Sequence, residues 1–387
     1  MGINHREPAY TDKAAPFIEE FGGKIGGLKY LKDTTDLTQH VLPITALRPN
    51  ESWGKRVPNL VHNIVRASHP HDFQGLVNVI DSQKVNVQKR KIGEVIDDIR
   101  ASARDELVIA YAQYENPAYN GDITIGIQAL MDRDTLHSDA FRRGSIIEHP
   151  NQPGSYLIEW VEEWEDVMGH QQRELTSGMY NDKGELARVL NLMDAPPNSA
   201  AELIEIYQRI RRAELVRDDL TFQVEFGSAP NMPPLIYQVR AFMRKCLAGF
   251  HIDEEEANSK LVMGVTPETG VVLPVLVQNR GAPECPDDPV AILTPRPNDF
   301  RNLEFRPKHV GAYLAGTSHG RSPAPNMQHG NFWKAQKADV TVFEGRGMGF
   351  DDLAHHDGKL RDAQEGLQDI KVQIISDGVH AIVKKVD

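Results

Sequence analysis

The feature that most constrains the fold is a pair of apolar, strand-like runs carrying charged and amide side chains. TFQVEF (221–226) and PLIYQVR (234–240) flank a turn rich in Gly, Ser, Pro and Asn, which predicts a β-hairpin. Gln238 and Arg240 are two residues apart and point to one face, and Glu225 shares that face in one of the two registers. These side chains predict either a Mg²⁺-polyphosphate site or a structural salt bridge across the hairpin.

The remaining patterns predict a mixed α/β protein with two domains, 1–250 and 251–387. In the first, helical spacing runs through 90–113, and Ser199 and Glu202 form a capping box that begins a second helix. From about residue 255 the chain has short β-rich runs, so the second domain is small and sheet-rich. The strands predicted in the first domain, besides the hairpin, are 60–66, 121–131, 144–150 and 155–161.

Composition narrows the function classes. The 387 residues carry a formal net charge of −12, which argues against a nucleic-acid-binding protein, since such proteins need phosphate-neutralising cations. The two cysteines are too few for a disulfide framework and fit a reducing cytosol. No stretch approaches the roughly 20 apolar residues of a membrane helix, so we expect a cytoplasmic protein.

Two further segments carry residues suited to phosphate binding. In Gly22-Gly23-Lys24, the glycines would let the backbone approach phosphate oxygens and the lysine would add a positive charge. The alternative without a ligand is a surface loop that leads into a helix. The Walker spacing is absent, which excludes a P-loop NTPase. Arg66, at the end of a predicted strand, can aim a guanidinium at phosphates or form a surface ion pair.

The order and spacing of these segments resemble the nucleotide-binding half of the phosphoenolpyruvate synthase and pyruvate phosphate dikinase family, which has an ATP-grasp fold. The resemblance covers about residues 17–245. The matching segments are 22–31, 65–68, 72–75, 125–131, 164–169, 223–226 and 238–241. The resemblance implies α/β (α+β) architecture, with an ATP-grasp-like domain followed by a small β-rich swivelling domain.

Site roles follow from the resemblance residue by residue. Lys24 and Arg66 would contact the polyphosphate, and Arg240 would stabilise charge at the transferring phosphoryl group. The residues implied for adenine are Gln128 to Met131, and those implied for Mg²⁺ or ribose are Glu165, Glu225 and Gln238. The implied cofactors are therefore ATP and Mg²⁺.

The second domain contains a candidate phosphate acceptor. Residues 315–320, Ala-Gly-Thr-Ser-His-Gly, resemble the family's phosphohistidine motif, so His319 would accept a phosphoryl group from ATP. Pro323 and Pro325 break the helix that the family has after this motif, and the alternative is an exposed loop histidine. Arg321 could stabilise the phosphate, and His329 is a weaker candidate acceptor.

The sequence therefore predicts an Mg-ATP-dependent phosphotransferase acting on an unknown small-molecule or protein acceptor. Two alternatives remain: a degenerate nucleotide-binding regulatory or assembly subunit, favoured by the departures at Ala67, Gln223 and Ala241, and an ATP-grasp ligase that makes an acyl phosphate. No nucleic-acid or membrane partner is expected. The sequence does not decide between a monomer and a homo-oligomer.

Overall fold

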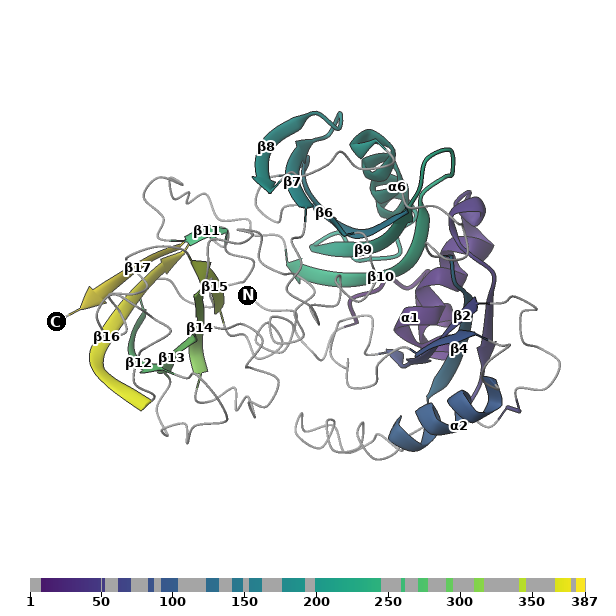
Figure 1. Cartoon of the computed structure of the whole chain (residues 1–387), viewed down its shortest axis with the longest axis horizontal. Coiled ribbons are helices and arrows are strands. Elements are labelled where there is room, and N and C mark those ends of the chain that lie inside the picture. The colour runs from purple at the N-terminus through teal and green to yellow at the C-terminus, as the bar shows by residue number, and fades with distance from the viewer. Residues whose placement is uncertain are drawn as a thin grey trace.

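The structure is a computed structural model, and it groups the described strands into three sheets (Figure 1). The described residues are 8–49, 51–52, 62–70, 83–86, 92–103, 123–131, 141–148, 153–161, 176–191, 199–244, 259–261, 271–277, 290–294, 310–316, 341–345, 366–376 and 381–386. The helices among them are α1 (Ala15–Thr34), the short 3₁₀ helix η1 (Thr38–His40), α2 (Ile92–Ser102) and α6 (Ala200–Arg212). The chain is a mixed α/β protein, as the sequence predicts.

Two antiparallel sheets are formed by residues before 245. The four-stranded sheet has the order β1-β4-β2-β3, with β1 (Ile44–Leu47), β2 (His62–Ser68), β3 (Gln83–Asn86) and β4 (Thr124–Ala129). The six-stranded sheet has the order β10-β9-β5-β6-β7-β8, with β5 (Arg142–Glu148), β6 (Ser155–Val161), β7 (Thr176–Asn181), β8 (Leu186–Asn191), β9 (Leu220–Ser228) and β10 (Leu235–Arg244).

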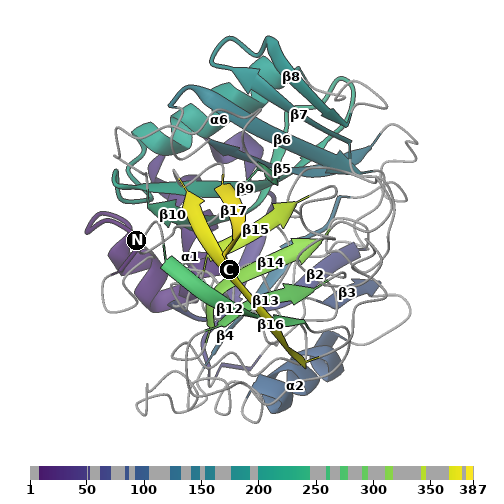
Figure 2. The ribbon, with the colours of Figure 1, turned by 90° about the vertical axis from the view of Figure 1, so that its left-hand side faces the viewer.

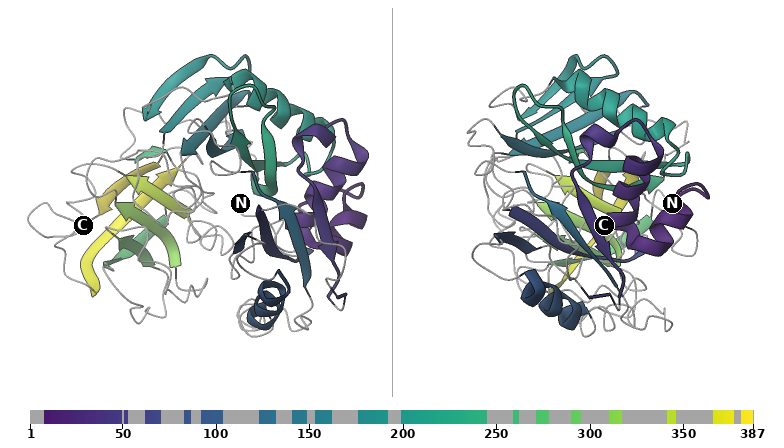
Figure 3. Two further views of the ribbon diagram at one scale, coloured as in Figure 1. Left: turned by 45° about the vertical axis from the view of Figure 1, so that its right-hand side comes forward. Right: turned by 90° about the vertical axis from the view of Figure 1, so that its right-hand side faces the viewer.

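The helix α1 lies where these two sheets meet and contacts β1, β2, β4 and β10 (Figure 3). It is two helical segments joined at Gly22, whose φ of 78° and ψ of 168° are not helical. The sequence predicts a loop leading into a helix here; the observed segment is helical on both sides of one glycine. The break lets the second half of α1 begin against the end of β2.

Each of the two sheets buries one face under a helix. Val65, Ile125 and Ile127 pack on the apolar side of α2, in a cluster with Val95 and Ile99. On the six-stranded sheet, the alternate residues of the central strands pack on α1 and α6. That cluster includes Ile146, Ile158, Trp160, Phe222, Val224 and Val239 of the sheet with Leu28, Leu203, Tyr207 and Ile210 of the helices. The opposite face of this sheet carries the polar residues of the candidate site.

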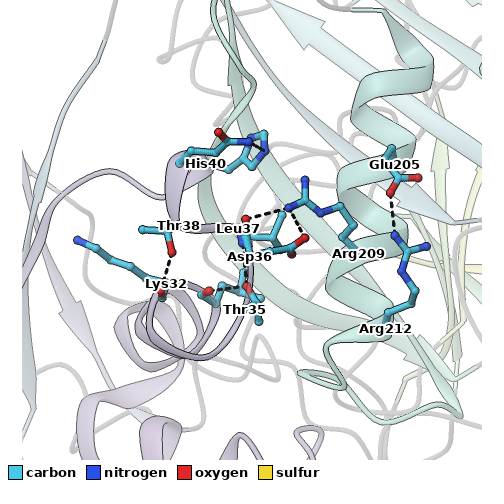
Figure 4. A network of polar contacts seen from close by, with 11 residues as sticks. Lys32, Thr35, Asp36, Leu37, Thr38, His40, Glu205, Arg209 and Arg212 are labelled. Atoms are coloured by element: carbon cyan, nitrogen blue, oxygen red, sulfur yellow. Dashed lines mark hydrogen bonds and ion pairs between the residues drawn. The ribbon is translucent and has the colours of Figure 1, made fainter.

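The predicted capping box begins α6 as expected. Ser199 Oγ accepts from the Glu202 N–H, and the Glu202 carboxylate accepts from the Ser199 N–H. Arg209 of α6 donates to the Asp36 carbonyl at 2.9 Å and pairs with the Asp36 carboxylate at 2.8 Å, which fixes the segment after α1 (Figure 4). His40 Nδ1 lies 2.7 Å from the Pro234 carbonyl, so the same segment is also held at the start of β10.

The third sheet contains the described strands after residue 258. Its order is β11-β15-β14-β13-β12-β16-β17, and β12 to β15 are parallel neighbours (Figure 2). The strands are β11 (Ser259–Leu261), β12 (Val271–Val277), β13 (Val290–Thr294), β14 (Val310–Gly316), β15 (Thr341–Gly345), β16 (Gly366–Ser376) and β17 (Ala381–Val386). The predicted boundary near residue 250 lies outside the described residues.

The hairpin and most other predicted elements of the first 245 residues are present. The predicted hairpin is β9 and β10, the predicted pair 144–150 and 155–161 is β5 and β6, and the helix predicted over 90–113 is described as α2. The sequence patterns did not predict β1, β3, β7 and β8, of which β1, β3 and β8 lie at the edges of their sheets. Within the described residues no helix has the length and apolar character needed to span a membrane.

The Gly22→Ala substitution is expected to destabilise the protein more than Gly154→Ala. Both glycines have positive φ, 78° and 83°, where a side chain costs about 1–2 kcal/mol. Only at Gly22 would the new Cβ also meet backbone, at 2.4 Å from the Ser68 carbonyl carbon. We expect Gly22→Ala to lower the free energy of unfolding by at least about 2 kcal/mol more than Gly154→Ala in urea titrations. Equal losses would contradict the packing described for the break in α1.

Candidate functional site

The predicted hairpin places its polar residues on one face. In the β9–β10 register Gln238 is opposite Glu225, and Arg240 is opposite Gln223. Directly opposite residues of antiparallel strands share a face. Of the two registers that the sequence leaves open, the observed one therefore puts Glu225 beside Gln238 and Arg240.

Arg240 is already engaged by two partners on this face. Its Nη2 lies 3.1 Å from Glu225 Oε1, and its Nε donates to Gln223 Oε1 at 2.7 Å. Both charged side chains are 7% exposed, so the pair is well removed from water. Removing one partner of such a pair leaves an uncompensated buried charge. The structural salt bridge is thus present, and it holds the guanidinium in a fixed position at the edge of the sheet.

Arg66 joins the two sheets. It lies on β2 of the four-stranded sheet, and its Nη1 donates to the Tyr237 carbonyl on β10 at 3.1 Å. Arg66 is 1% exposed, so the surface ion pair that the sequence allows is not what the structure shows. The bond brings the Arg66 guanidinium next to Gln238, the residue after Tyr237.

Lys24 begins the second half of α1, at the end of β2. The N–H groups on either side of it are used within the protein: Gly23 N–H donates to the His69 carbonyl at 2.8 Å, and Ile25 N–H donates to Ser68 Oγ at 3.1 Å. These two donors are therefore not directed at a ligand. Lys24 itself is buried, with 6% exposure, and its ammonium group is the cation that this segment contributes.

The glycines around Lys24 make room for protein rather than for a ligand. A Cβ at Gly26 would lie 2.3 Å from the Phe17 carbonyl oxygen, and one at Gly126 would lie 1.9 Å from Ile25 Cδ1. These close approaches let the halves of α1 fold together and let α1 contact β4. The two glycines predicted to admit phosphate oxygens also face protein, because a Cβ at Gly22 would meet the Ser68 backbone and the Gly23 N–H donates to the His69 carbonyl.

Gln128 lies on β4, on the sheet face shared by Arg66. Arg66 is opposite Gly126 in the β2–β4 register, and Gln128 is two residues further along the strand. The side chain is fully buried, and among the described residues neither its Oε1 nor its Nε2 has a hydrogen-bond partner. Leaving both amide atoms without partners is costly, so a ligand with a donor and an acceptor would find matching groups here.

Met131 is not open to an adenine amino group through its carbonyl. That oxygen accepts hydrogen bonds from Tyr237 Oη at 2.6 Å and from Arg143 Nη2 at 3.0 Å. A carbonyl oxygen has two lone pairs, and both are used. The implied role of Met131 at the adenine edge is therefore limited to its side chain or its N–H.

A second carboxylate lies on the same polar face and was not singled out in the sequence. Glu159 on β6 is opposite Ser145 on β5, and Ser145 is opposite Glu225 on β9. Gln238, Glu225, Ser145 and Glu159 therefore form one row across four strands. The available signal was a lone acidic residue inside the otherwise apolar run YLIEWV.

The two carboxylates of this row differ in their surroundings. Glu225 faces Arg240, whereas Glu159 is 1% exposed and, within the described part of the chain, neither of its oxygens has a hydrogen-bond partner. Burial raises the pKa of Glu159 to about 8, opposed only by the nearby Ser145 hydroxyl. Glu159 is thus largely protonated at neutral pH.

Two residues of the predicted site lie outside the described residues. They are Glu165, implied for Mg²⁺ or ribose, and His319, the candidate phosphate acceptor. Arg321 and His329 lie there as well.

The residues that are present fit Mg²⁺ only as a phosphate-bridged ion. The described residues contain no group of three or more His, Cys, Asp or Glu side chains that could hold a metal. Glu225 and Gln238 supply two oxygen-bearing side chains in direct opposition. Mg²⁺ usually keeps several waters and binds through one or two carboxylates plus substrate phosphates, which two such ligands can satisfy.

Comparison with known proteins gives partial structural likenesses. No protein-family model matches the chain, and no curated protein matches it. Matching solved structures include D-cycloserine synthetase DcsG, at 10% identity and a TM-score of 0.32, covering 62% of this chain and 68% of that chain. A D-alanine-D-alanine ligase from Coxiella burnetii matches at 8% identity and a TM-score of 0.30, covering 60% of this chain and 49% of that one.

A third match is the ATP-grasp ligase PsnB complexed with a minimal precursor. It has 11% identity and a TM-score of 0.29, and the match covers 60% of this chain and 54% of that chain. The chain therefore spans about half the length of the second and third structures. Since likenesses of this size define no activity, we take the function from the geometry of the chain itself.

The stability of the protein is expected to depend on pH through Glu159. Its folded pKa, about 8, is above the ordinary value of 4.5. The folded state therefore holds a proton that the unfolded state releases between these values, and stability falls as pH rises from about 5 to 8. The limiting slope is about 1.4 kcal/mol per pH unit. Glu159→Gln should remove this decline, so the free energy of unfolding of the variant should rise relative to that of the wild type as pH rises.

The measurement is urea unfolding at several pH values for wild type, Glu159→Gln and the exposed control Glu19→Gln. The control should follow the wild-type pH profile. Parallel profiles for wild type and Glu159→Gln would show that Glu159 titrates alike in the folded and unfolded states.

Proposed function

We propose that residues 8–244 bind Mg-ATP where the four-stranded and six-stranded sheets meet, and that the protein transfers the γ-phosphoryl group to an acceptor, as an ATP-grasp enzyme does. The observation that carries this proposal is the Arg66–Tyr237 hydrogen bond of 3.1 Å. It brings a buried cation of one sheet to the polar face of the other, beside Gln238 and near the Glu225–Arg240 pair.

The charges at this junction suit a polyphosphate. Lys24, Arg66 and Arg240 are three buried cations on α1, β2 and β10. Buried cations are costly unless anions compensate them, and preorganised cations stabilise the charge of a transferring phosphoryl group. Glu225 forms an ion pair with Arg240 in this structure, and three cations in one region would stabilise the negative charge of a bound triphosphate.

Gln128 suits the base of the nucleotide. An amide side chain can donate to one atom of adenine and accept from its amino group, which is the pairing that proteins use to recognise adenine. The fully buried Gln128 amide supplies one such donor and one such acceptor. Mg²⁺ would be held by Glu225 and Gln238 together with the phosphates, and would neutralise the charge that develops during transfer.

Direct transfer to a carboxylate is the reaction that these residues favour. A carboxylate oxygen of the acceptor attacks the γ-phosphorus, the bond to the β–γ bridging oxygen breaks, and ADP leaves. An amine then attacks the resulting acyl phosphate, with release of phosphate and a proton. This ligase chemistry needs only groups at the junction, whereas transfer through a phosphohistidine would need His319.

The proposed reaction also indicates the partners and the location of the protein. The proposed partners are the nucleotide and a small-molecule or protein acceptor, and a cytoplasmic location would supply both ATP and Mg²⁺. The second hypothesis is a dikinase, in which His319 would carry the phosphate to a distant acceptor. The products of ATP turnover distinguish it from a ligase.

Lys24→Met is expected to abolish most of the thermal stabilisation by Mg-ATP, because the ammonium group is proposed to contact the phosphates. A ligand at 100 times its Kd stabilises the native state by about 2.7 kcal/mol. The matched control is Lys32→Met, in the last turn of the same helix. Differential scanning fluorimetry at fixed Mg²⁺ measures the shift. An unchanged shift in Lys24→Met would remove this lysine from the site, and no shift in the wild type would overturn nucleotide binding.

The products of ATP turnover are expected to be ADP and phosphate, and His319→Ala is expected to retain this turnover. Direct transfer to an acceptor breaks only the β–γ linkage and leaves the histidine unmodified. Ion-exchange analysis of nucleotides, with peptide mass spectrometry at neutral pH, measures both. The ligase hypothesis would be wrong, and the dikinase hypothesis supported, if AMP formed and the peptide carrying His319 held an acid-labile phosphate.

A further inference from the structure

The polar face of the six-stranded sheet continues beyond the proposed phosphate site. Glu159 and Ser145 are cross-strand neighbours on β6 and β5, at the end of the row that begins with Gln238 and Glu225. Glu225 forms an ion pair with Arg240, whereas within the described ranges Glu159 forms no ion pair. Ser145 is 0% exposed and Glu159 is 1% exposed.

Three oxygen atoms that can all accept hydrogen bonds once Glu159 is ionised lie together at this point. Among the described residues, Glu159 Oε1, Glu159 Oε2 and Ser145 Oγ each lack a hydrogen bond of normal geometry. A buried polar group without a partner costs about 1–3 kcal/mol, so donors to these three oxygen atoms would stabilise the site. A primary ammonium group has three N–H donors and no acceptor, so its donors match the three oxygen atoms in number.

The two guanidinium groups on the same face have other partners. Arg143 is on β5, two residues from Ser145, but its Nη2 donates to the Met131 carbonyl and its guanidinium lies over the Tyr237 ring. Arg240 is paired with Glu225, two strands away from Glu159. Neither guanidinium is directed at Glu159.

We propose that Glu159 and Ser145 bind the primary ammonium group of the acceptor. This inference rests on the proposed function and adds to it the chemical group by which the acceptor is recognised. Neighbouring strands are about 4.8 Å apart, so Glu159 lies about 10 Å from Glu225 along the row. A short acceptor can therefore place its ammonium group at Glu159 and extend its reactive end toward the Glu225–Arg240 pair.

A divalent cation fits this pair less well than an ammonium group. Mg²⁺ needs six oxygen ligands in octahedral geometry, and Ca²⁺ needs six to eight. One carboxylate and one hydroxyl fall well short of either number. Binding of an ammonium group releases the proton that Glu159 holds at neutral pH, so the proton moves from the carboxyl group to the buffer as the ion pair forms.

Methylammonium is the probe for this site, because it carries the proposed group and nothing else. The expected result is a concentration-dependent rise in the Tm of the full chain with methylammonium chloride, and an apparent affinity at least about tenfold weaker in Glu159→Gln, since a buried charge-assisted contact is lost. Tetramethylammonium chloride at the same ionic strength has the charge but no N–H donor and should give no comparable shift. Calorimetry in two buffers should show proton release by the wild type only.

Several results would overturn the proposal. These are equal shifts with both cations, a methylammonium shift retained in Glu159→Gln, a Mg²⁺ shift that Glu159→Gln abolishes, or no response to methylammonium in the wild type. The last would leave Glu159 as a neutral structural acid. Failure here is separable from failure of the proposed function, because Glu159→Gln should keep its Mg-ATP shift and Lys24→Met should keep its methylammonium shift.

Discussion

The packing of α1 between the four-stranded and six-stranded sheets determines where every proposed ligand-binding side chain lies. The helix can occupy that place only because it breaks at Gly22, where the backbone has positive φ and runs against Ser68. The second half of α1 then contacts β4 across Gly126, and Arg66 crosses to the Tyr237 carbonyl. The break at Gly22 and the Arg66–Tyr237 hydrogen bond therefore both act at the junction of the two sheets.

The two faces of the six-stranded sheet have different roles: one packs the hydrophobic core, and the other carries the polar residues of the proposed site. One face buries apolar residues against α1 and α6, while the other buries charges at a cost that must be offset locally. Arg240 forms an ion pair with Glu225, and that carboxylate suits a metal-bridged phosphate. In the part of the chain that the structure describes Glu159 has no such partner, and burial raises its pKa to about 8. Two carboxylates of one row thus have different surroundings, which is how one surface can bind both an anion and a cation.

Local patterns in the sequence predicted the elements well but not their contacts. The capping box at Ser199 and the hairpin over 221–240 depend on neighbouring residues, and both are present. The register that brings Glu225 opposite Gln238 depends on the turn and could not be read from alternation alone. Glu159 was missed because its significance comes from Ser145 on another strand and from what buries both. The glycines near Lys24 were assigned to phosphate, yet their neighbours are Ser68 and Phe17, which only tertiary packing reveals.

The spacing of the row limits what Glu159 can do in the proposed reaction. A general base must lie within hydrogen-bond reach of the proton that it removes. Glu159 is two strands from Glu225, about 10 Å away, so it cannot serve an amine that attacks next to the Glu225–Arg240 pair. Its proposed role is therefore recognition of the distant end of the acceptor. Recognition at that distance restricts the acceptor to molecules whose ammonium group and reactive group are separated by less than the same 10 Å, and the choice of substrate follows from the geometry of the sheet.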